Sequence, residues 1–160
     1  MGSLVWQLNP ANPLVIQQMA SGFERSGGLV EAAEIYEDLL NKAEPEGLVF
    51  RERAAQLYLQ ADKPDKAQGH LEALLKINLA NPQANRLMGF LLTDKEEYGE
   101  AARHFERVVN ANPRFQPAYY ELVEAQLRSG KSKDAKQTLP KACSGRRSIM
   151  SSHQLPLSHV

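Results

Sequence analysis

The side chains that could carry out chemistry are few, and their spacing favours no catalytic or metal site. His70 and His104 stand at equivalent positions of a repeated pattern. Equivalent positions on neighbouring helical units lie roughly 10 Å apart, which is too far to share a metal ion, so we interpret them as surface histidines. The sequence contains no CxxC or HExxH pattern. Cys143 is the single cysteine and has no second thiol for an internal disulfide.

Two further patterns have structural explanations. Acidic runs such as Glu96-Glu97-Glu100 fall near the expected starts of helices, where negative side chains complement the helix dipole. Gly27-Gly28 lacks the flanking Gly-Lys-Ser/Thr of a phosphate-binding loop and fits a tight turn. The formal net charge is zero, with 19 basic and 19 acidic residues, which argues against a surface built to hold polyphosphate. We therefore predict no catalytic residue, no metal, no cofactor and a non-enzymatic role.

A repeat organises the chain. Alanines recur at a nearly constant spacing, and large side chains follow most of them by four and by seven positions, which is one helical stripe. The columns are Ala32, Ala67, Ala101, Ala135; Tyr36, Leu71, Phe105, Leu139; and Leu39, Leu74, Val108, Ala142. A second helical stripe precedes each alanine, and a short turn separates the two stripes of each unit. Each unit is therefore predicted to be a helical hairpin.

In the second stripe, a large residue stands beside a small or β-branched one, as in Met88-Gly89, so that two helices can approach closely. The predicted helices are 13–26, 29–42, 47–60, 64–78, 82–94, 98–110, 116–129 and 132–139.

The chain resembles the tetratricopeptide repeat family, whose period is about 34 residues. The third unit matches best, with Met88, Gly89, Leu92, Tyr98, Ala101, Phe105, Val108 and Pro113 in the family's register. The departures include Asn85, where the family prefers a large apolar residue, and Gln126, where it prefers an aromatic one. The resemblance implies an all-α fold, a right-handed α-solenoid of about four antiparallel hairpins, in the units 13–46, 47–81, 82–115 and 116–143.

Both ends of the repeat domain, residues 11–143, look unfinished. Residues 1–10 match either the last turns of a truncated upstream repeat or an N-terminal cap in which Trp6 covers the first hairpin. Pro140 falls within the last helix, and residues 144–160 form a basic segment without helical period, which predicts a disordered tail. Solenoids usually end in polar capping helices. The uncapped ends predict self-association or a docked neighbour.

The resemblance implies a concave groove lined by the first helix of each hairpin. The predicted partner-binding residues are Gln17, Glu52, Gln56, Arg86, Phe90, Tyr120, Glu124 and Arg128. Phe90 and Tyr120 are candidate anchors for a partner's side chain, unless they pack on each other, and Arg86 and Arg128 are candidates to pair with a partner's carboxylates. The mixed charges of the groove argue against nucleic acid as a partner.

The lining lacks the signatures of two peptide-binding subtypes of the family. The members that hold chaperone C-termini carry a Lys and an Asn one turn apart on a first helix, and no such pair occurs here. The asparagine ladder of the sugar-transferase members is missing too. We therefore expect a protein-protein interaction scaffold for another peptide or folded partner. The alternative is a substrate-docking or regulatory segment of a larger enzyme whose catalytic domain lies outside this chain.

No membrane insertion is expected, because no run approaches 18 apolar residues. Residues 1–20 show no signal peptide, which favours the cytoplasm.

Overall fold

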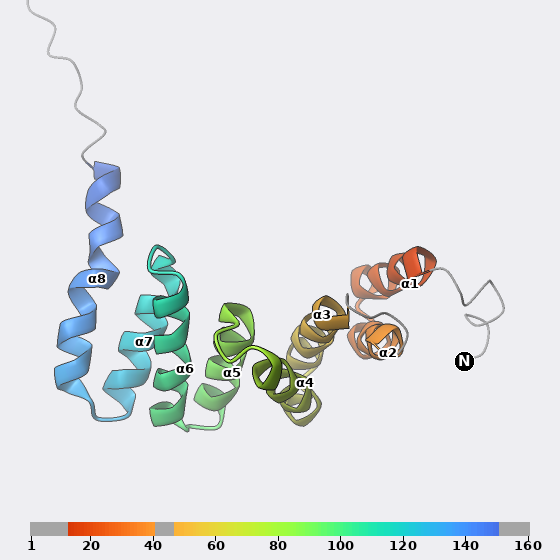
Figure 1. The fold of residues 1–160 in the computed structure, drawn as a ribbon, viewed down its shortest axis with the longest axis horizontal. Coiled ribbons are helices and arrows are strands. Elements are labelled where there is room, and N and C mark those ends of the chain that lie inside the picture. The colour runs from red at the N-terminus through yellow and green to blue at the C-terminus, as the bar shows by residue number, and fades with distance from the viewer. Residues whose placement is uncertain (1–12, 41–46, 151–160) are drawn as a thin grey trace, which may run out of the picture. The chain divides into compact units, whose positions relative to one another are not determined.

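The chain folds into consecutive helices in the computed structural model, which describes residues 13–40 and 47–150 and the side chains of residues 14–40 and 47–143. The helices are α1 (Pro13–Ser26), α2 (Leu29–Leu40), α3 (Gly47–Gln60), α4 (Pro64–Ile77), α5 (Pro82–Asp94), α6 (Tyr98–Ala111), α7 (Gln116–Arg128) and α8 (Ser132–Met150) (Figure 1). We call α1, α3, α5 and α7 the first helices of the hairpins, and α2, α4, α6 and α8 the second helices. The predicted all-α hairpin solenoid is confirmed.

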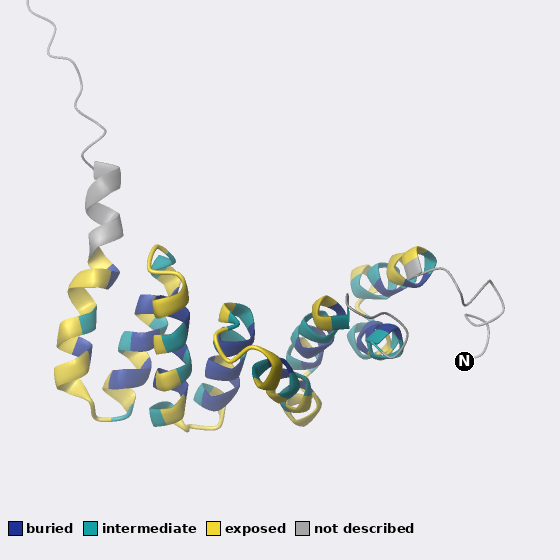
Figure 2. Cartoon of the chain, in the orientation of Figure 1, coloured by how far each residue is buried: buried dark blue, intermediate teal, exposed yellow. Residues whose placement is uncertain are grey.

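Two compact units make up the chain, Met1–Leu87 and Met88–Val160. In the first, α1 packs on α2, α2 on α3 and α3 on α4. In the second, α6 packs on α7, which packs on α8. Figure 2 shows buried residues on α6 and α7, whereas most of the described side chains of α8 are exposed.

Every described helix starts where the sequence predicts it, and the ends of α1 and of α3 to α7 agree with the prediction to within one position. The turns explain this accuracy. Each hairpin turn contains one residue with positive φ, and these residues are Gly27, Asp62, Glu96 and Gly130. They recur with the period of the alanine columns.

The backbone bonds of these turns are the same in all four hairpins. The N–H of the residue after the positive-φ position donates to the carbonyl five positions back at 2.8 Å, as in Gly28 to Phe23 and Lys131 to Gln126. The positive-φ residue itself donates to the carbonyl three positions back, at 3.0–3.2 Å. This pair of bonds is the Schellman motif, which satisfies the last carbonyls of a helix. The chain therefore reverses in the same way in every hairpin.

The core consists of the predicted columns. Ala32, Ala67, Ala101 and Ala135 are all buried, as are Tyr36, Leu71 and Phe105 and the column of Leu39, Leu74, Val108 and Ala142. Gly89 shows why a small residue is needed in the second stripe. A Cβ added at Gly89 would lie 2.6 Å from Cε1 of Phe105, so the α5 backbone approaches the Phe105 ring more closely than any side chain allows.

The last helix differs from the prediction. It was expected to end at residue 139, but α8 continues through Pro140 to Met150, so that residues 144–150 belong to the helix. Pro140 is exposed, and a proline inside a helix removes one backbone N–H donor. Leu139 was assigned to the buried stripe and is 47% exposed.

Some predictions lie outside the described residues, namely those for residues 1–10, for the end of the second helix after Leu40 and for residues 151–160. Within the part of the chain that the structure describes, no helix combines the length and apolar character needed to cross a membrane.

Candidate functional site

The eight predicted partner-binding residues all lie on first helices. Gln17 is on α1, Glu52 and Gln56 are on α3, Arg86 and Phe90 are on α5, and Tyr120, Glu124 and Arg128 are on α7. The first four, Gln17 to Arg86, belong to unit Met1–Leu87, and the other four belong to unit Met88–Val160.

A shallow hollow of about 470 Å³ lies along α1 in the first unit. Its lining comes from one face of that helix: Leu14, Gln17, Gln18, Ser21 and Arg25. The hydroxyl of Ser21 donates to the Gln17 carbonyl at 3.0 Å and is therefore occupied within the helix. The hollow presents amide and guanidinium groups together with one exposed leucine.

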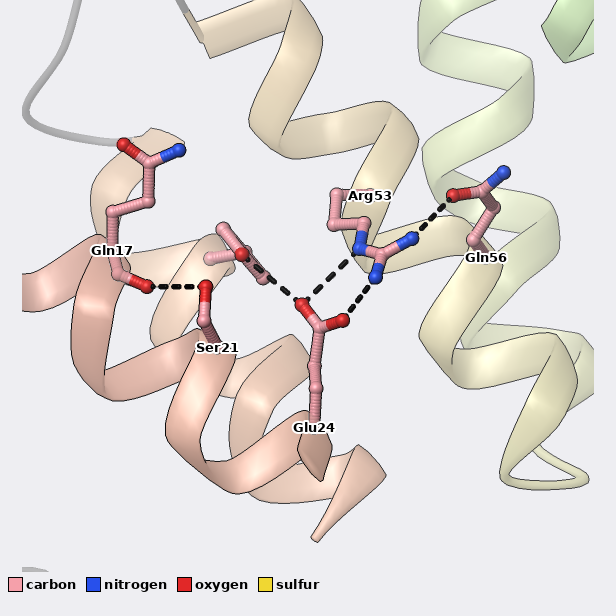
Figure 3. A network of polar contacts seen from close by, with 6 residues as sticks. Gln17, Ser21, Glu24, Arg53 and Gln56 are labelled. Atoms are coloured by element: carbon pink, nitrogen blue, oxygen red, sulfur yellow. Dashed lines mark hydrogen bonds and ion pairs between the residues drawn. The ribbon is translucent and has the colours of Figure 1, made fainter. Parts of the chain in front are cut away.

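A polar network on the same helix joins three helices of the first unit (Figure 3). Glu24 of α1 accepts hydrogen bonds from Tyr36 Oη of α2 and from Arg53 Nε of α3, each at 3.1 Å to Oε1. Arg53 Nη2 forms a second, ionic contact with Glu24 Oε2. Arg53 Nη1 donates to Gln56 Oε1 at 3.1 Å. The guanidinium therefore holds α1 against α3 through a two-point contact, a geometry that suits arginine and carboxylate.

The environment of this network favours the charged carboxylate. The Glu24 side chain is 14% exposed. Its pKa is lowered chiefly by the hydrogen bond from Arg53, while burial opposes the shift. Burial is the main cause that raises the pKa of Tyr36, so the phenol remains a hydrogen-bond donor. Glu24 is therefore ionised and paired at neutral pH.

Arg53 is the member of this network that sequence reasoning missed. Its partner, Glu24, lies 29 residues earlier, so the pair links consecutive hairpins. The signal available in the sequence was an acid and a base on consecutive first helices, a little less than one repeat apart. Gln56 was predicted to face a partner, but its amide oxygen is used by Arg53. Glu52 is half-buried, and burial raises the pKa of its carboxyl group.

In the second unit, Phe90 packs edge-on against Phe105 of α6, with ring centroids 5.5 Å apart, and remains 36% exposed. Phe90 on α5 thus contacts Phe105 on α6, the second helix of the same hairpin. Tyr120 and Leu127 on α7 are 43% and 55% exposed. All three present large apolar surface from first helices.

The predicted cation of α7 already has partners within the chain. Arg128 Nη2 contacts Glu124 Oε1 at 2.8 Å, and Nη1 donates to Tyr98 Oη at 3.3 Å. The guanidinium carbon also lies 5.3 Å from the centroid of the Tyr98 ring. Arg128 and Tyr98 border a hollow of about 510 Å³, to which acidic residues at the start of α6 and Lys131 contribute. Arg128 therefore pairs within the chain, while about half of its side chain (51%) remains exposed.

His70 packs within the first unit. Its ring stacks on Tyr58 with centroids 5.8 Å apart and an interplanar angle of 9°, and its Nε2 lies 2.7 Å from Glu37 Oε1. These contacts join α2, α3 and α4. No group of three or more His, Cys, Asp or Glu residues that could hold a metal ion occurs among the side chains given by the structure.

Comparison with known proteins agrees with this geometry. Residues 92–142 match the model of the tetratricopeptide repeat family. No curated protein matches the sequence.

Solved structures share the fold at low sequence identity. The MamA RS-1 ArsTM double mutant is 20% identical, with a TM-score of 0.77 over 89% of this chain and 80% of that chain. MamA 41-end from Desulfovibrio magneticus RS-1 is 20% identical, with a TM-score of 0.73 over 86% of this chain and 77% of the other. A tetratricopeptide repeat protein from Parabacteroides merdae is 22% identical, with a TM-score of 0.73 over 88% of this chain and 56% of that one. Residues 92–142 thus match a tetratricopeptide repeat, and these neighbours show that the chain shares the helical-hairpin fold of such repeat proteins.

Proposed function

We propose that this chain is a protein-interaction module without a catalytic role, and that it binds a peptide segment or a folded partner through its first helices. The observation that carries the proposal is the distribution of exposed large apolar side chains. Six of the nine found in the described residues lie on first helices: Leu14, Leu48, Val49, Phe90, Tyr120 and Leu127. The second helices contribute Ile77 and Leu139.

Single exposed apolar residues are ordinary on any protein surface, but here six lie on first helices against two on second helices. The first helices otherwise bury their apolar stripes in the hairpins. Covering the remaining apolar area with a partner is favourable by about 25 cal/mol per Å². The amides of Gln17 and Gln18 add hydrogen-bonding groups beside Leu14. A fold does not fix a function, so these side chains, and not the hairpins, support the assignment.

An affinity experiment with variants of each unit tests this proposal. Lysate from the source organism is passed over the immobilised chain, and bound proteins are identified by mass spectrometry. Two double variants, Leu14→Ala/Gln17→Ala and Phe90→Ala/Tyr120→Ala, each alter first helices of one unit. The control, Ile77→Ala/Leu139→Ala, removes exposed apolar side chains from second helices instead.

We expect the control to recover a specific partner as well as the native chain does. At least one first-helix variant should recover about tenfold less of that partner, which is the loss typical of a hot-spot residue. Equal recovery by all variants would place the binding site on another surface. Circular dichroism of each variant establishes that the helices persist.

A further inference from the structure

We infer that one face of α1 is a docking surface for residues 5–8 of this same chain, which lie on it as the last turn of a helix. We define the α1 docking face by three residues: Val15, Met19 and Gly22. Residues 5–8 lie outside the described part of the chain, so their position is what we propose. The inference goes beyond the proposed function, because it concerns a contact within the chain and needs no partner.

The α1 docking face is less covered than the same face of other first helices. Val15, Met19 and Gly22 are half-buried. The equivalent residues are all buried: Phe50, Ala54 and Leu57 in α3, and Ala118, Leu122 and Ala125 in α7. A Cβ added at Gly22 would meet no other part of the described chain within 4 Å. The α1 docking face therefore has room for a side chain that its counterparts already contact.

The second helix of the preceding hairpin covers this face in α3 and in α7. Helix α2 packs on α3, and α6 packs on α7. One contact is explicit, because the Phe50 ring of this face in α3 stacks on Tyr36 of α2, with centroids 5.9 Å apart. In sequence, the stretch that stands before α1 as α2 stands before α3 is the one that precedes Pro13. That stretch is therefore the occupant to consider.

The linker before α1 repeats a linker that the structure describes. Residues 9–13 are Asn-Pro-Ala-Asn-Pro, and residues 78–82, which join α4 to α5, are Asn-Leu-Ala-Asn-Pro. The Asn78 N–H donates to the Leu74 carbonyl at 2.9 Å and caps the end of α4. Asn81 Oδ1 accepts a hydrogen bond from the Ala84 N–H at 2.9 Å, and Pro82 begins α5.

Helix α1 likewise begins at a proline, Pro13. The shared sequence therefore predicts that Asn12 caps the start of α1 and that Asn9 caps the end of a preceding helix. The linker between α6 and α7 supports the second half of this prediction. It also begins with an asparagine, Asn112, whose N–H donates to the Val108 carbonyl at 2.9 Å.

Alignment of these linkers fixes which side chains of the segment face α1. The equivalent positions are Leu74 and Val108 for Val5, Leu75 and Val109 for Trp6, and Lys76 and Asn110 for Gln7. Both equivalents of Val5 are buried, those of Trp6 are half-buried and buried, and both equivalents of Gln7 are exposed. Val5 and Trp6 should therefore cover the α1 docking face, while Gln7 faces solvent. The covered apolar area favours this contact, and the short tether keeps the segment near the face.

Fluorescence tests the contact directly, because Trp6 is the single tryptophan of the chain. Quenching by acrylamide is measured on the full chain, with and without urea. We expect native Trp6 to be quenched much less than Trp6 of the unfolded chain. Val5→Asp should raise quenching to the unfolded level, whereas the matched control Gln7→Asp, which places the same charge on the solvent side, should not. Met19→Ala should raise it too, but Met88→Ala, at the equivalent position of α5, should not.

Hydrogen exchange read by mass spectrometry locates the contact. Val5→Asp should speed exchange in α1 by about tenfold, the factor expected when one buried valine is lost from a docked segment. Gln7→Asp should leave exchange in α1 unchanged. The peptide that contains Ala101 of α6 is the internal reference and should not respond to either variant.

Three results would overturn the inference. If Trp6 is quenched equally in the native and the unfolded chain, the segment does not dock. If Trp6 is protected but insensitive to Val5→Asp, the tryptophan covers the hairpin alone and not as part of a helical turn. If Val5→Asp exposes Trp6 without faster exchange in α1, the segment docks on another surface. None of these results depends on a partner, so the lysate experiment and this one can fail separately.

Discussion

Two buried amides show how differently the same kind of residue can be accommodated. Asn85 and Gln126 both occupy positions where the family prefers a large apolar or aromatic side chain, and both are buried. Asn85 Nδ2 donates to the carbonyls of Leu79 and Asn81, each at 2.8 Å. Gln126 Oε1 is buried without a hydrogen-bond partner. The sequence marked both as departures, and the structure distinguishes them.

We expect Asn85→Leu to destabilise the protein, although it restores the residue type that the family prefers. The amide closes the segment between α4 and α5, and its loss leaves the Leu79 carbonyl without that donor. Net losses of about 1–2 kcal/mol are typical for removal of a buried hydrogen-bond partner. Urea unfolding followed by circular dichroism measures the change. A variant as stable as the native chain would show that these bonds are not needed.

Gln126→Leu should have the opposite effect. A buried acceptor without a partner costs about 1–3 kcal/mol, and an apolar side chain of similar size avoids that cost. We therefore expect the free energy of unfolding to rise by about 1 kcal/mol in the same urea assay. The surface variant Glu106→Gln, at an exposed position of α6, serves as the control and should have no effect. A lower unfolding free energy for Gln126→Leu would mean that the amide has a stabilising role.

For individual residues, the sequence predicted reliably which side chains form the core, but it did not predict which polar side chains pair with each other. The alanine columns follow from the sequence period, which does not depend on the rotamers of the side chains. The pairing of Arg128 with Glu124 and Tyr98, and of Arg53 with Glu24, depends on where long side chains point. Repeat spacing places those residues on their helices but does not choose among the available partners.

At the scale of helices, the Glu24 network is a polar link between consecutive hairpins. It joins α1 and α2 of the first hairpin to α3 of the second. Apolar packing supports the same junction, because the rings of Tyr36 and Phe50 stack with centroids 5.9 Å apart. Apolar stacking does not depend on pH, whereas the carboxylate contact does.

We therefore expect the stability of the protein to fall in acid in part through Glu24. Its pKa in the folded chain is lowered, chiefly by Arg53, from an ordinary value of about 4.3 for glutamate. A lowered pKa means that the stabilisation is fully present above about pH 4.3 and is lost as the pH falls through the folded value. Thermal unfolding between pH 3 and pH 7 would show this loss.

Glu24→Gln isolates the contribution of this carboxylate. The variant should be less stable than the native chain at pH 7 and should lose less stability between pH 7 and pH 3. Glu106→Gln, on the exposed side of α6, is the control and should keep the native pH profile. Parallel pH profiles for Glu24→Gln and the native chain would contradict the assignment.

Helix boundaries were predictable where the turn chemistry is local. Pro82 begins α5, and the side-chain oxygen of Asn81 accepts a hydrogen bond from the Ala84 N–H at 2.9 Å, which is an N-cap. Gly89 was also predictable, since a small residue in a packed stripe indicates close approach. The end of α8 was not predictable. The sequence shows that Pro140 lacks a backbone N–H donor, but it does not show whether the proline ring faces a neighbouring helix or solvent.

For the molecule as a whole, a repeat protein gains its stability from contacts between neighbouring elements. Helices with more buried contacts should therefore open less often. In the second unit, α6 buries Ala101, Ala102, Phe105, Val108 and Val109 and packs on α7. The described side chains of α8 bury Ala135 and Ala142. Burial within this unit is thus uneven between α6 and α8.

We expect α8 to exchange its amide hydrogens faster than α6, because local opening is easiest where few apolar contacts are lost. Hydrogen exchange read by mass spectrometry should show exchange that increases from about Ser132 onward, compared with the peptide that contains Ala101. Pro140→Ala provides the internal test. Alanine restores a backbone donor in the middle of α8, so exchange in α8 should slow while exchange in α6 stays the same. If α8 were already as protected as α6 in the native chain, burial within the unit would not be what governs local opening.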